Sequence, residues 1–223
     1  MSVEIKLTKK PIPYEKAMLF LNKRVKEVKN GDNKELIWIL EHPKTYTAGV
    51  SFKQNEIIDK TIKIIRTNRG GKITLHNPGQ KIIYFVLNLN NRKKDIRKFI
   101  NTIETTIIEF LKILKINAKK DKKNIGIWVK GKKIAAIGLR VSRWVAFHGF
   151  SINISNNLKE YLKIVPCGLD NKKVTSVFLE RKIVPKNFEK KLVNIFVKNI
   201  NKIKKFFFRK FSNSLSYSAL KLY

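Results

Sequence analysis

The chain has 223 residues, 43% of them hydrophobic, so it is long enough to bury one sizeable core. No stretch approaches the roughly 20 apolar residues that cross a bilayer, and residues 1–10 lack the apolar run of a signal peptide. A single cysteine cannot form an internal disulfide, which fits a cytoplasmic protein. The 49 Lys+Arg against 16 Asp+Glu give a net charge of +33, which points toward anionic partners.

This charge has more than one explanation. Modules that bind nucleic acid interleave aromatic and basic residues on one face, whereas here the lysines are spread along the chain and the aromatics lie mostly in apolar segments. The residue types in excess share A- and T-rich codons, which indicates compositional drift. We therefore expect neither nucleic-acid nor membrane binding. Most of the net charge is attributed to drift, and we expect the smaller remaining part to steer acidic protein partners toward the chain.

The N-terminal half predicts one helix and several short strands. Apolar residues at three- and four-residue spacing over 13–29, followed by Asn30-Gly31, indicate an amphipathic helix and its end. Largely apolar runs predict strands at residues 36–40, 62–66 and 82–89. The first strand leads into a loop that holds Glu41-His42-Pro43 and Thr47-Ala48-Gly49, and a glycine-bearing segment spans 69–80.

The C-terminal half predicts two helices, at 95–114 with a wide apolar face and at 188–203. Strands are expected at 125–129, 133–141 and 144–154, the first two joined by a turn at Lys130-Gly131-Lys132. Because helices and strands are clustered, the predicted class is α+β, a mixed or antiparallel sheet with flanking helices. We expect one domain over 1–205 and a tail, 206–223, that is either frayed or docked.

Cys167 lies between Pro166 and Gly168, two residues that favour a bend. On its own, a lone cysteine is more often a small core residue than a reactive thiol.

Three other segments carry candidate chemistry, each with a plain structural alternative. Paired glycines and polar groups in 69–80 favour a ligand site over two ordinary turns, although the spacing excludes a P-loop. Lys133 begins a small, apolar strand, but in a chain with 49 Lys+Arg a solvated strand end is, taken alone, the stronger interpretation. His148 interrupts an aromatic strand, and the sequence fits a functional histidine and an ordinary core or edge histidine about equally well. The chain's three histidines are far apart without cysteine partners, so no metal site is expected.

The order of these motifs resembles one family. The motifs in this chain are Arg69-Gly70-Gly71, Thr74-x-His76-x-Pro78-Gly79-Gln80, Lys133-Ile134-Ala135-Ala136-Ile137-Gly138, His148-Gly149 and Pro166-Cys167-Gly168, together with Glu41-His42-Pro43 and Gly126-Ile127-Trp128. Over about Tyr14 to Phe178 the chain is similar to the octanoyltransferases of lipoate biosynthesis, in the biotin/lipoate protein ligase superfamily. It departs at Asn77, where the family usually has glycine; we expect the turn to be kept because asparagine tolerates positive φ.

The resemblance implies a biotin/lipoate protein ligase-like catalytic domain that works without a cofactor. It implies Cys167 as the nucleophile, which takes the octanoyl group as a thioester, and Lys133 as its activating partner. It further implies that three segments line the acyl pocket. Their residues are Arg69, Gly70, Gly71, Lys72, Ile73, Thr74, Leu75, His76, Ala136, Ile137, Gly138, Gly149, Phe150 and Ser151.

The implied donor is octanoyl-acyl carrier protein. The implied acceptors are lysines on the lipoyl domains of 2-oxoacid dehydrogenase complexes and on the glycine cleavage H protein. The main alternative is an ATP-dependent lipoate–protein ligase, which shares the fold and the glycine segment but needs no cysteine nucleophile. Pro166-Cys167-Gly168 argues against it.

Overall fold

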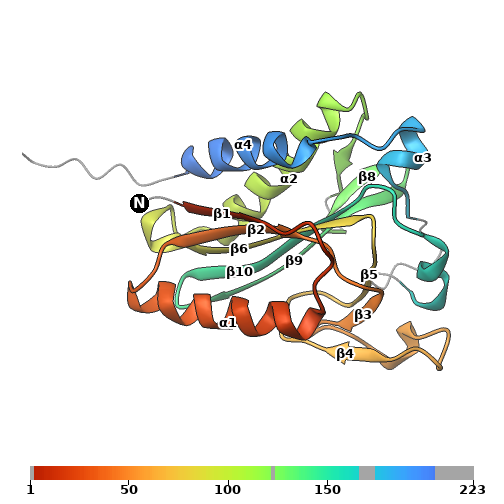
Figure 1. The fold of residues 1–223 in the computed structure, drawn as a ribbon, viewed down its shortest axis with the longest axis horizontal. Helices are drawn as coiled ribbons and strands as arrows, with labels where there is room; N and C mark the ends of the chain where they lie inside the picture. Colours follow the sequence, from red (N-terminus) through yellow and green to blue (C-terminus); the bar gives the residue numbers. More distant parts are fainter. Residues whose placement is uncertain (1–2, 122–123, 166–173, 204–223) are drawn as a thin grey trace, which may run out of the picture.

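The computed structural model describes residues 3–121, 124–165 and 174–203 (Figure 1). Cys167 and the tail at 206–223 lie outside the described residues. The main sheet has the strand order β1 (Val3–Leu7), β2 (Glu35–Leu40), β6 (Gln80–Asn88), β10 (Val145–Asn153), β9 (Lys132–Ser142), β8 (Ile127–Val129), β7 (Lys119–Lys120). A smaller sheet has the order β4 (Ile64–Arg66), β3 (Thr45–Ala48), β5 (Ile73–His76).

Helices cover both faces of the main sheet, as Figure 1 shows. Helix α1 (Tyr14–Asn30) packs on one face, and α2 (Ile96–Ile113) and α4 (Phe188–Asn201) pack on the other. A short helix, α3 (Val177–Arg181), and the 3₁₀ turns η1 (Gln54–Glu56), η2 (Leu89–Asn91) and η3 (Lys159–Lys163) complete the described elements.

The continuous apolar runs of β2 and β6 follow from this layering. In β6, Ile83, Phe85 and Leu87 pack toward α2 and α4, whereas Ile82, Tyr84 and Val86 pack toward α1. Side chains alternate between the two faces of a strand, so a strand buried on both faces needs apolar residues at nearly every position.

The helix boundaries follow from ordinary capping. Gly31 adopts φ +86 after α1, where its N–H bonds to the Val28 carbonyl and its lack of a Cβ avoids strain. Asp95 caps α2, where its carboxylate accepts from the Lys98 backbone N–H at 2.9 Å.

The mixed α+β class is confirmed: β1 and β2 are parallel, as are β3 and β4, and the other strand pairs are antiparallel. Strands β1, β3 and β7 and helix α3 were not predicted. Thr47 and Ala48 belong to β3 instead of a loop. Trp144 belongs to the turn before β10 instead of the strand, with φ +61.

A buried ion pair ties β2 to the end of β6. Arg92 is fully buried and donates from Nη2 to Glu35 Oε2 at 2.8 Å and from Nη1 to the Asn88 carbonyl at 2.9 Å. Glu35 also accepts from the Asn88 N–H at 2.7 Å, so both charges are held in one network.

We expect Glu35→Gln to lower the free energy of unfolding by about 3 kcal/mol, because it leaves the Arg92 charge buried without a counter-ion. The ion pair between the exposed Lys23 and the half-buried Glu27 is the control, and Lys23→Gln should change stability by less than about 1 kcal/mol. Urea unfolding of the two variants measures the difference. Equal effects would show that the buried pair contributes no more than a surface pair.

Candidate active site

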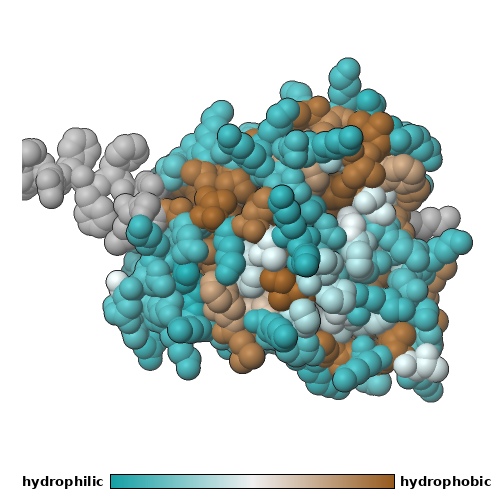
Figure 2. Space-filling view, viewed as in Figure 1, coloured by the Kyte–Doolittle hydropathy of each residue, from teal (hydrophilic) through white to brown (hydrophobic). Residues whose placement is uncertain are grey.

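A cavity of about 510 Å³ lies where strands β6, β9 and β10 face the smaller sheet and the segment before β5. Figure 2 shows pale and apolar surface in the middle of this view, bordered by hydrophilic side chains. Most of the predicted site residues line the cavity, namely Arg69, Gly70, Gly71, Lys72, Thr74, His76, Lys133, Ala136, Ile137, Gly138, Gly149, Phe150 and Ser151. The three predicted segments, distant in the sequence, therefore meet around one space.

Ile73 and Leu75 do not belong to the cavity lining. Both are fully buried on the other side of β5, in a cluster with Tyr46, Tyr161 and Ile164. Because alternate residues of a strand point to opposite faces, Thr74 and His76 reach the cavity and their neighbours cannot. The prediction treated the whole segment as one lining and missed this alternation.

Glycines leave the space that the cavity occupies. Gly138 and Gly149 are direct partners on β9 and β10, so no side chain rises from either strand at this point. The Gly70 N–H donates to the Leu139 carbonyl at 3.2 Å, which brings the glycine segment against β9. A Cβ at Gly49 would lie 2.2 Å from the Gly71 carbonyl oxygen, so that approach depends on glycine.

Asn77, where the chain departs from the family pattern, is not among the residues with positive φ. Gly79 adopts φ +87 in the same turn instead. The Asn77 side chain donates to the Asn157 carbonyl at 2.8 Å and accepts from Asn156 Nδ2 at 2.9 Å. The turn is kept through side-chain hydrogen bonds and Gly79, not through a left-handed asparagine.

Lys133 lies at the end of the cavity where β9 begins, and it is only 7% exposed. Its ammonium is 5.4 Å from the centre of the Trp128 ring, a cation–π contact. Gly126 makes room for it, since a Cβ there would lie 2.4 Å from Lys133 Cε. Val174 forms a β-bridge with Lys133, and the Thr175 N–H donates to the Lys133 carbonyl at 2.9 Å.

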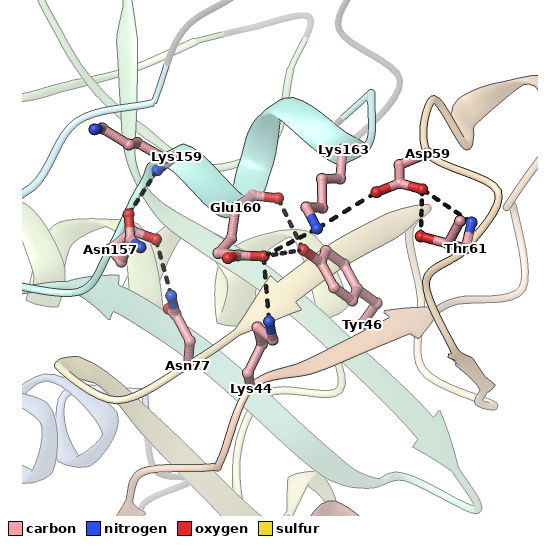
Figure 3. A network of polar contacts seen from close by, with 9 residues as sticks. All are labelled: Lys44, Tyr46, Asp59, Thr61, Asn77, Asn157, Lys159, Glu160 and Lys163. Carbon is pink, nitrogen blue, oxygen red and sulfur yellow. Dashed lines mark hydrogen bonds and ion pairs between the residues drawn. The ribbon is translucent and has the colours of Figure 1, made fainter.

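Polar contacts hold η3, which leads toward the segment containing Cys167, against the smaller sheet (Figure 3). Tyr46 donates to the Glu160 carboxylate at 2.8 Å, and Lys163 pairs with Asp59 at 3.4 Å. Beyond the helix, the Val165 N–H donates to the Glu56 carbonyl at 2.8 Å. The residues on both sides of positions 166–173 are thus anchored, Val165 to η1 and Val174 to Lys133.

His76 and Tyr84 form a buried floor of the cavity, and His42 and Gln80 are hydrogen-bonded to them. His42 Nδ1 donates to the Ile12 carbonyl at 2.6 Å, so its Nε2 can accept from the Tyr84 hydroxyl, 2.9 Å away. His76 Nδ1 lies 2.7 Å from Gln80 Oε1. Burial is the main cause that lowers the pKa of both imidazoles, that of His76 to about 3, so the floor is neutral near pH 7.

Sequence reasoning missed part of the lining. Tyr14 comes from the start of α1, Ile82 and Tyr84 from β6, Ile100 from α2 and Ile125 from the loop before β8. No motif marks these positions, because they were assigned to the core of ordinary helices and strands. Within the described ranges, no group of three or more His, Cys, Asp or Glu side chains could hold a metal ion. Nor is any described helix long and apolar enough to span a membrane.

The buried histidines predict a stability that falls on acidification. Burial, with the charges of Arg69 and Arg140, lowers the pKa of His148 to about 4, below the ordinary 6.5. Between pH 6.5 and 4 the unfolded chain therefore binds a proton that the folded chain does not, and stability is lost as pH falls through this window.

From pH 7.5 to 5.5 we expect the His148 contribution alone to be a loss of about 1 kcal/mol in the free energy of unfolding. Between pH 7.5 and 5.5, the free energy of unfolding of His148→Asn should therefore fall by about 1 kcal/mol less than that of the native chain. This difference does not depend on how stable the variant is at pH 7.5. Urea unfolding at the two pH values measures both. Identical losses would mean that the pKa of His148 is the same in the folded and the unfolded chain.

The sequence comparisons decide the family. A family model of the lipoyl protein ligase A/B catalytic domain matches residues 13–197, most of the chain and nearly all of the site. The chain belongs to this family. The match begins just before α1 and ends within α4, so it contains the cavity, the smaller sheet and every strand of the main sheet except β1.

Curated relatives in this family carry the name octanoyltransferase. The chain is 42% identical to that of Ehrlichia chaffeensis over 181 residues, covering 78% of this chain and 85% of the relative. It is 41% identical to that of Rickettsia bellii over 199 residues, covering 83% and 95%. It is 37% identical to that of Novosphingobium aromaticivorans, covering 86% and 90%.

Solved structures agree on the fold. A lipoate-protein ligase A bound with ATP superposes with a TM-score of 0.70 at 15% identity, covering 89% of this chain and 86% of the other. A bi-partite lipoate protein ligase from Thermoplasma acidophilum gives 0.65 at 14% identity, covering 91% and 84%. At such identities the likeness concerns the fold alone, which confirms the predicted biotin/lipoate ligase-like architecture.

Proposed function

We propose that the chain transfers an octanoyl group from acyl carrier protein to a lipoyl-domain lysine through a thioester on Cys167. The chain is an acyltransferase of lipoate biosynthesis, as its octanoyltransferase relatives indicate. The observation that carries the proposed mechanism is the placement of Lys133, which is buried in the lining of the cavity. Lys133 pairs with Val174, which follows the Cys167 segment in the sequence.

In the first step, the Cys167 thiolate attacks the carbonyl carbon of the octanoyl thioester. A new carbon–sulfur bond forms and the bond to the carrier sulfur breaks. A free thiol has a pKa near 8.5 and is only a few per cent thiolate at neutral pH, and a nearby ammonium increases that fraction. Lys133 supplies the positive charge and gives its proton to the departing carrier thiolate.

In the second step, the ε-amine of the acceptor lysine attacks the octanoyl-Cys167 thioester. The carbon–nitrogen bond of the amide forms and the Cys167 thiolate leaves. Lys133, neutral after the first step, accepts the proton that the amine loses. The enzyme thus returns to a thiolate and an ammonium without ATP, metal or cofactor in the reaction balance.

The cavity suits a medium-length acyl chain. Its glycine-lined strands leave space between the sheets, while Ile82, Ile137 and Phe150 supply apolar walls. The neutral His42 and His76 add no charge that would oppose an apolar ligand. Arg69 is held at one wall by hydrogen bonds from Nη2 to the Thr47 carbonyl, at 2.8 Å, and hydroxyl, at 2.9 Å.

The proposed acceptors are the lipoyl domains of 2-oxoacid dehydrogenase complexes and the glycine cleavage H protein, in the cytoplasm with the carrier protein. We assign catalysis to the domain at 1–205.

The test is a transfer assay with purified octanoyl-carrier protein and apo-lipoyl domain. We expect octanoylated lysine without ATP, and no product from free octanoate with ATP and Mg²⁺. The reverse pattern would establish the ligase reaction, the main alternative, and reject the proposed one.

A further inference from the structure

The turn between β9 and β10 is built from residues that do not favour its conformation. Ser142 pairs with Val145, so Arg143 and Trp144 form a two-residue loop, and both have positive φ, +50 and +61. Such loops prefer Asn and Gly, because a side chain in the left-handed region costs roughly 1–2 kcal/mol. The hairpin before it also has a side chain in the first of these positions, Lys130 with φ +47, but places Gly131 in the second.

Trp144 is accounted for by its contacts. It packs against the core beside α2 and α4, its carbonyl accepts from the Leu89 N–H at 2.6 Å, and the Lys94 ammonium lies 5.6 Å from its ring centre. Arg143, in contrast, is exposed, and within the described part of the chain no carboxylate forms an ion pair with it. Strain that packing does not explain is typical of functional positions.

Two further cations lie beside Arg143. Phe147 and Val145 pack toward α1, and their cross-strand partners Arg140 and Ser142 point to that same side of the sheet. Lys29, at the end of α1, donates to the Ser142 hydroxyl at 3.0 Å, and Figure 1 shows this end of α1 alongside the hairpin. We call Lys29, Arg140 and Arg143 the hairpin patch.

The three positive charges of the patch act on one another. Partial burial and the charges of Arg143 and Arg140 lower the pKa of Lys29. Lys72, which lines the cavity, is in contrast paired with Glu56 at 3.0 Å. An anion bound at the patch would relieve this repulsion, as charge-assisted hydrogen bonds to phosphate commonly do.

The patch lies at one end of the cavity. Arg140 follows Gly138 by two residues on β9, about 7 Å along the strand, and the intervening Leu139 lines the cavity. Lys133 lies at the other end of the same strand, about 23 Å from Arg140 along the backbone. An extended phosphopantetheine arm is of comparable length, with its phosphate at one end and its acylated sulfur at the other.

We propose that the hairpin patch binds the phosphate of the donor's phosphopantetheine arm, with the arm running beside β9 over the mouth of the cavity toward Lys133 and the octanoyl group entering the cavity itself. The proposal rests on the proposed function for the identity of the donor. It assigns the excess positive charge of this surface a particular ligand, and it accounts for an arginine in the strained turn.

The main experiment compares two small donors, octanoyl-phosphopantetheine and octanoyl-pantetheine, which differ only in the phosphate. For the native enzyme we expect the phosphate to raise kcat/KM about tenfold, and for Arg140→Gln/Arg143→Gln we expect most of that advantage to disappear. The control is Lys190→Gln/Lys191→Gln/Lys198→Gln on α4, on the opposite face of the sheet, which removes three positive charges against two in the test variant. This control should keep the higher kcat/KM that the phosphate gives.

Three outcomes would overturn the proposal: equal loss with both donors, no loss with either, or a loss seen only with the whole carrier protein. The last would assign the patch to the carrier's surface instead of the phosphate.

A second measurement separates this proposal from the proposed function. Calorimetric binding of phosphopantetheine and pantetheine needs no acyl transfer, and the native chain should prefer the former. Arg143→Gly should lose part of that preference while its urea midpoint stays the same or rises, because glycine relieves the left-handed strain. If Arg143→Gly is less stable, or binds phosphopantetheine as well as the native chain, the turn has no role in phosphate binding. If native transfer is absent but this preference is present, the proposed function fails and the phosphate site stands.

Discussion

Cys167→Ser is expected to lower octanoyl transfer by at least about 10³-fold, to the background of the uncatalysed reaction. A serine hydroxyl stays protonated near neutral pH without a strong base, and the neutral histidines His42 and His76 are occupied in hydrogen bonds. Cys167→Ala should lose the same activity, since neither variant offers a thiolate. Transfer of octanoyl from carrier protein to a lipoyl domain, followed by mass spectrometry of the acceptor, measures the loss.

Substitution of the only cysteine is expected to leave the fold intact. Unchanged urea unfolding is therefore the control for both variants. Transfer by a folded Cys167→Ala enzyme at near-native rates would exclude covalent catalysis and leave direct attack by the acceptor amine.

Lys133→Arg is expected to lower kcat by about 10²–10⁴-fold, although it keeps the positive charge. Guanidinium does not give up its proton near neutral pH, so it cannot return a proton between the two steps. It is also planar and larger, whereas Gly126 and Trp128 enclose the lysine side chain closely.

Single-turnover measurements separate charge from proton transfer in this variant. If Lys133 shuttles the proton, transfer from a preformed octanoyl-enzyme to the amine should be slow in Lys133→Arg even when loading is retained in part. Gly126→Ala provides a positioning control, since its Cβ would displace the ammonium, and we expect a lower kcat with little change in KM. Native rates of both half-reactions in Lys133→Arg would remove the proton-transfer role.

The sequence predicted the parts of the fold that repeat a pattern. The run at 36–40 reads as a buried strand because β2 packs on both faces, and the apolar stripe of 95–114 reads as α2 because it faces one core. The segment of β3 could not be recognised, since its four residues owe their strand conformation to pairing with β4 and β5.

The site was predictable only where motifs carried it. Gly70, Gly138 and Gly149 stand out in the sequence, and the cavity indeed forms where they meet. Tyr14 and Ile82 read as core residues, because nothing local shows that their helix and strand end beside an open space. Only the tertiary arrangement shows which side of β5 faces the cavity. His76 lies on that side, and Leu75 lies on the other, in the core.

The central claim is a covalent octanoyl-enzyme on Cys167, and intact-protein mass spectrometry after incubation with octanoyl-carrier protein tests it most directly. We predict that the native chain gains the mass of one octanoyl group in place of one hydrogen. The adduct should map to the peptide that contains Cys167, be removed by hydroxylamine, and disappear when apo-lipoyl domain is added. A native enzyme that turns over without this adduct, or that carries it on another residue, would contradict the account.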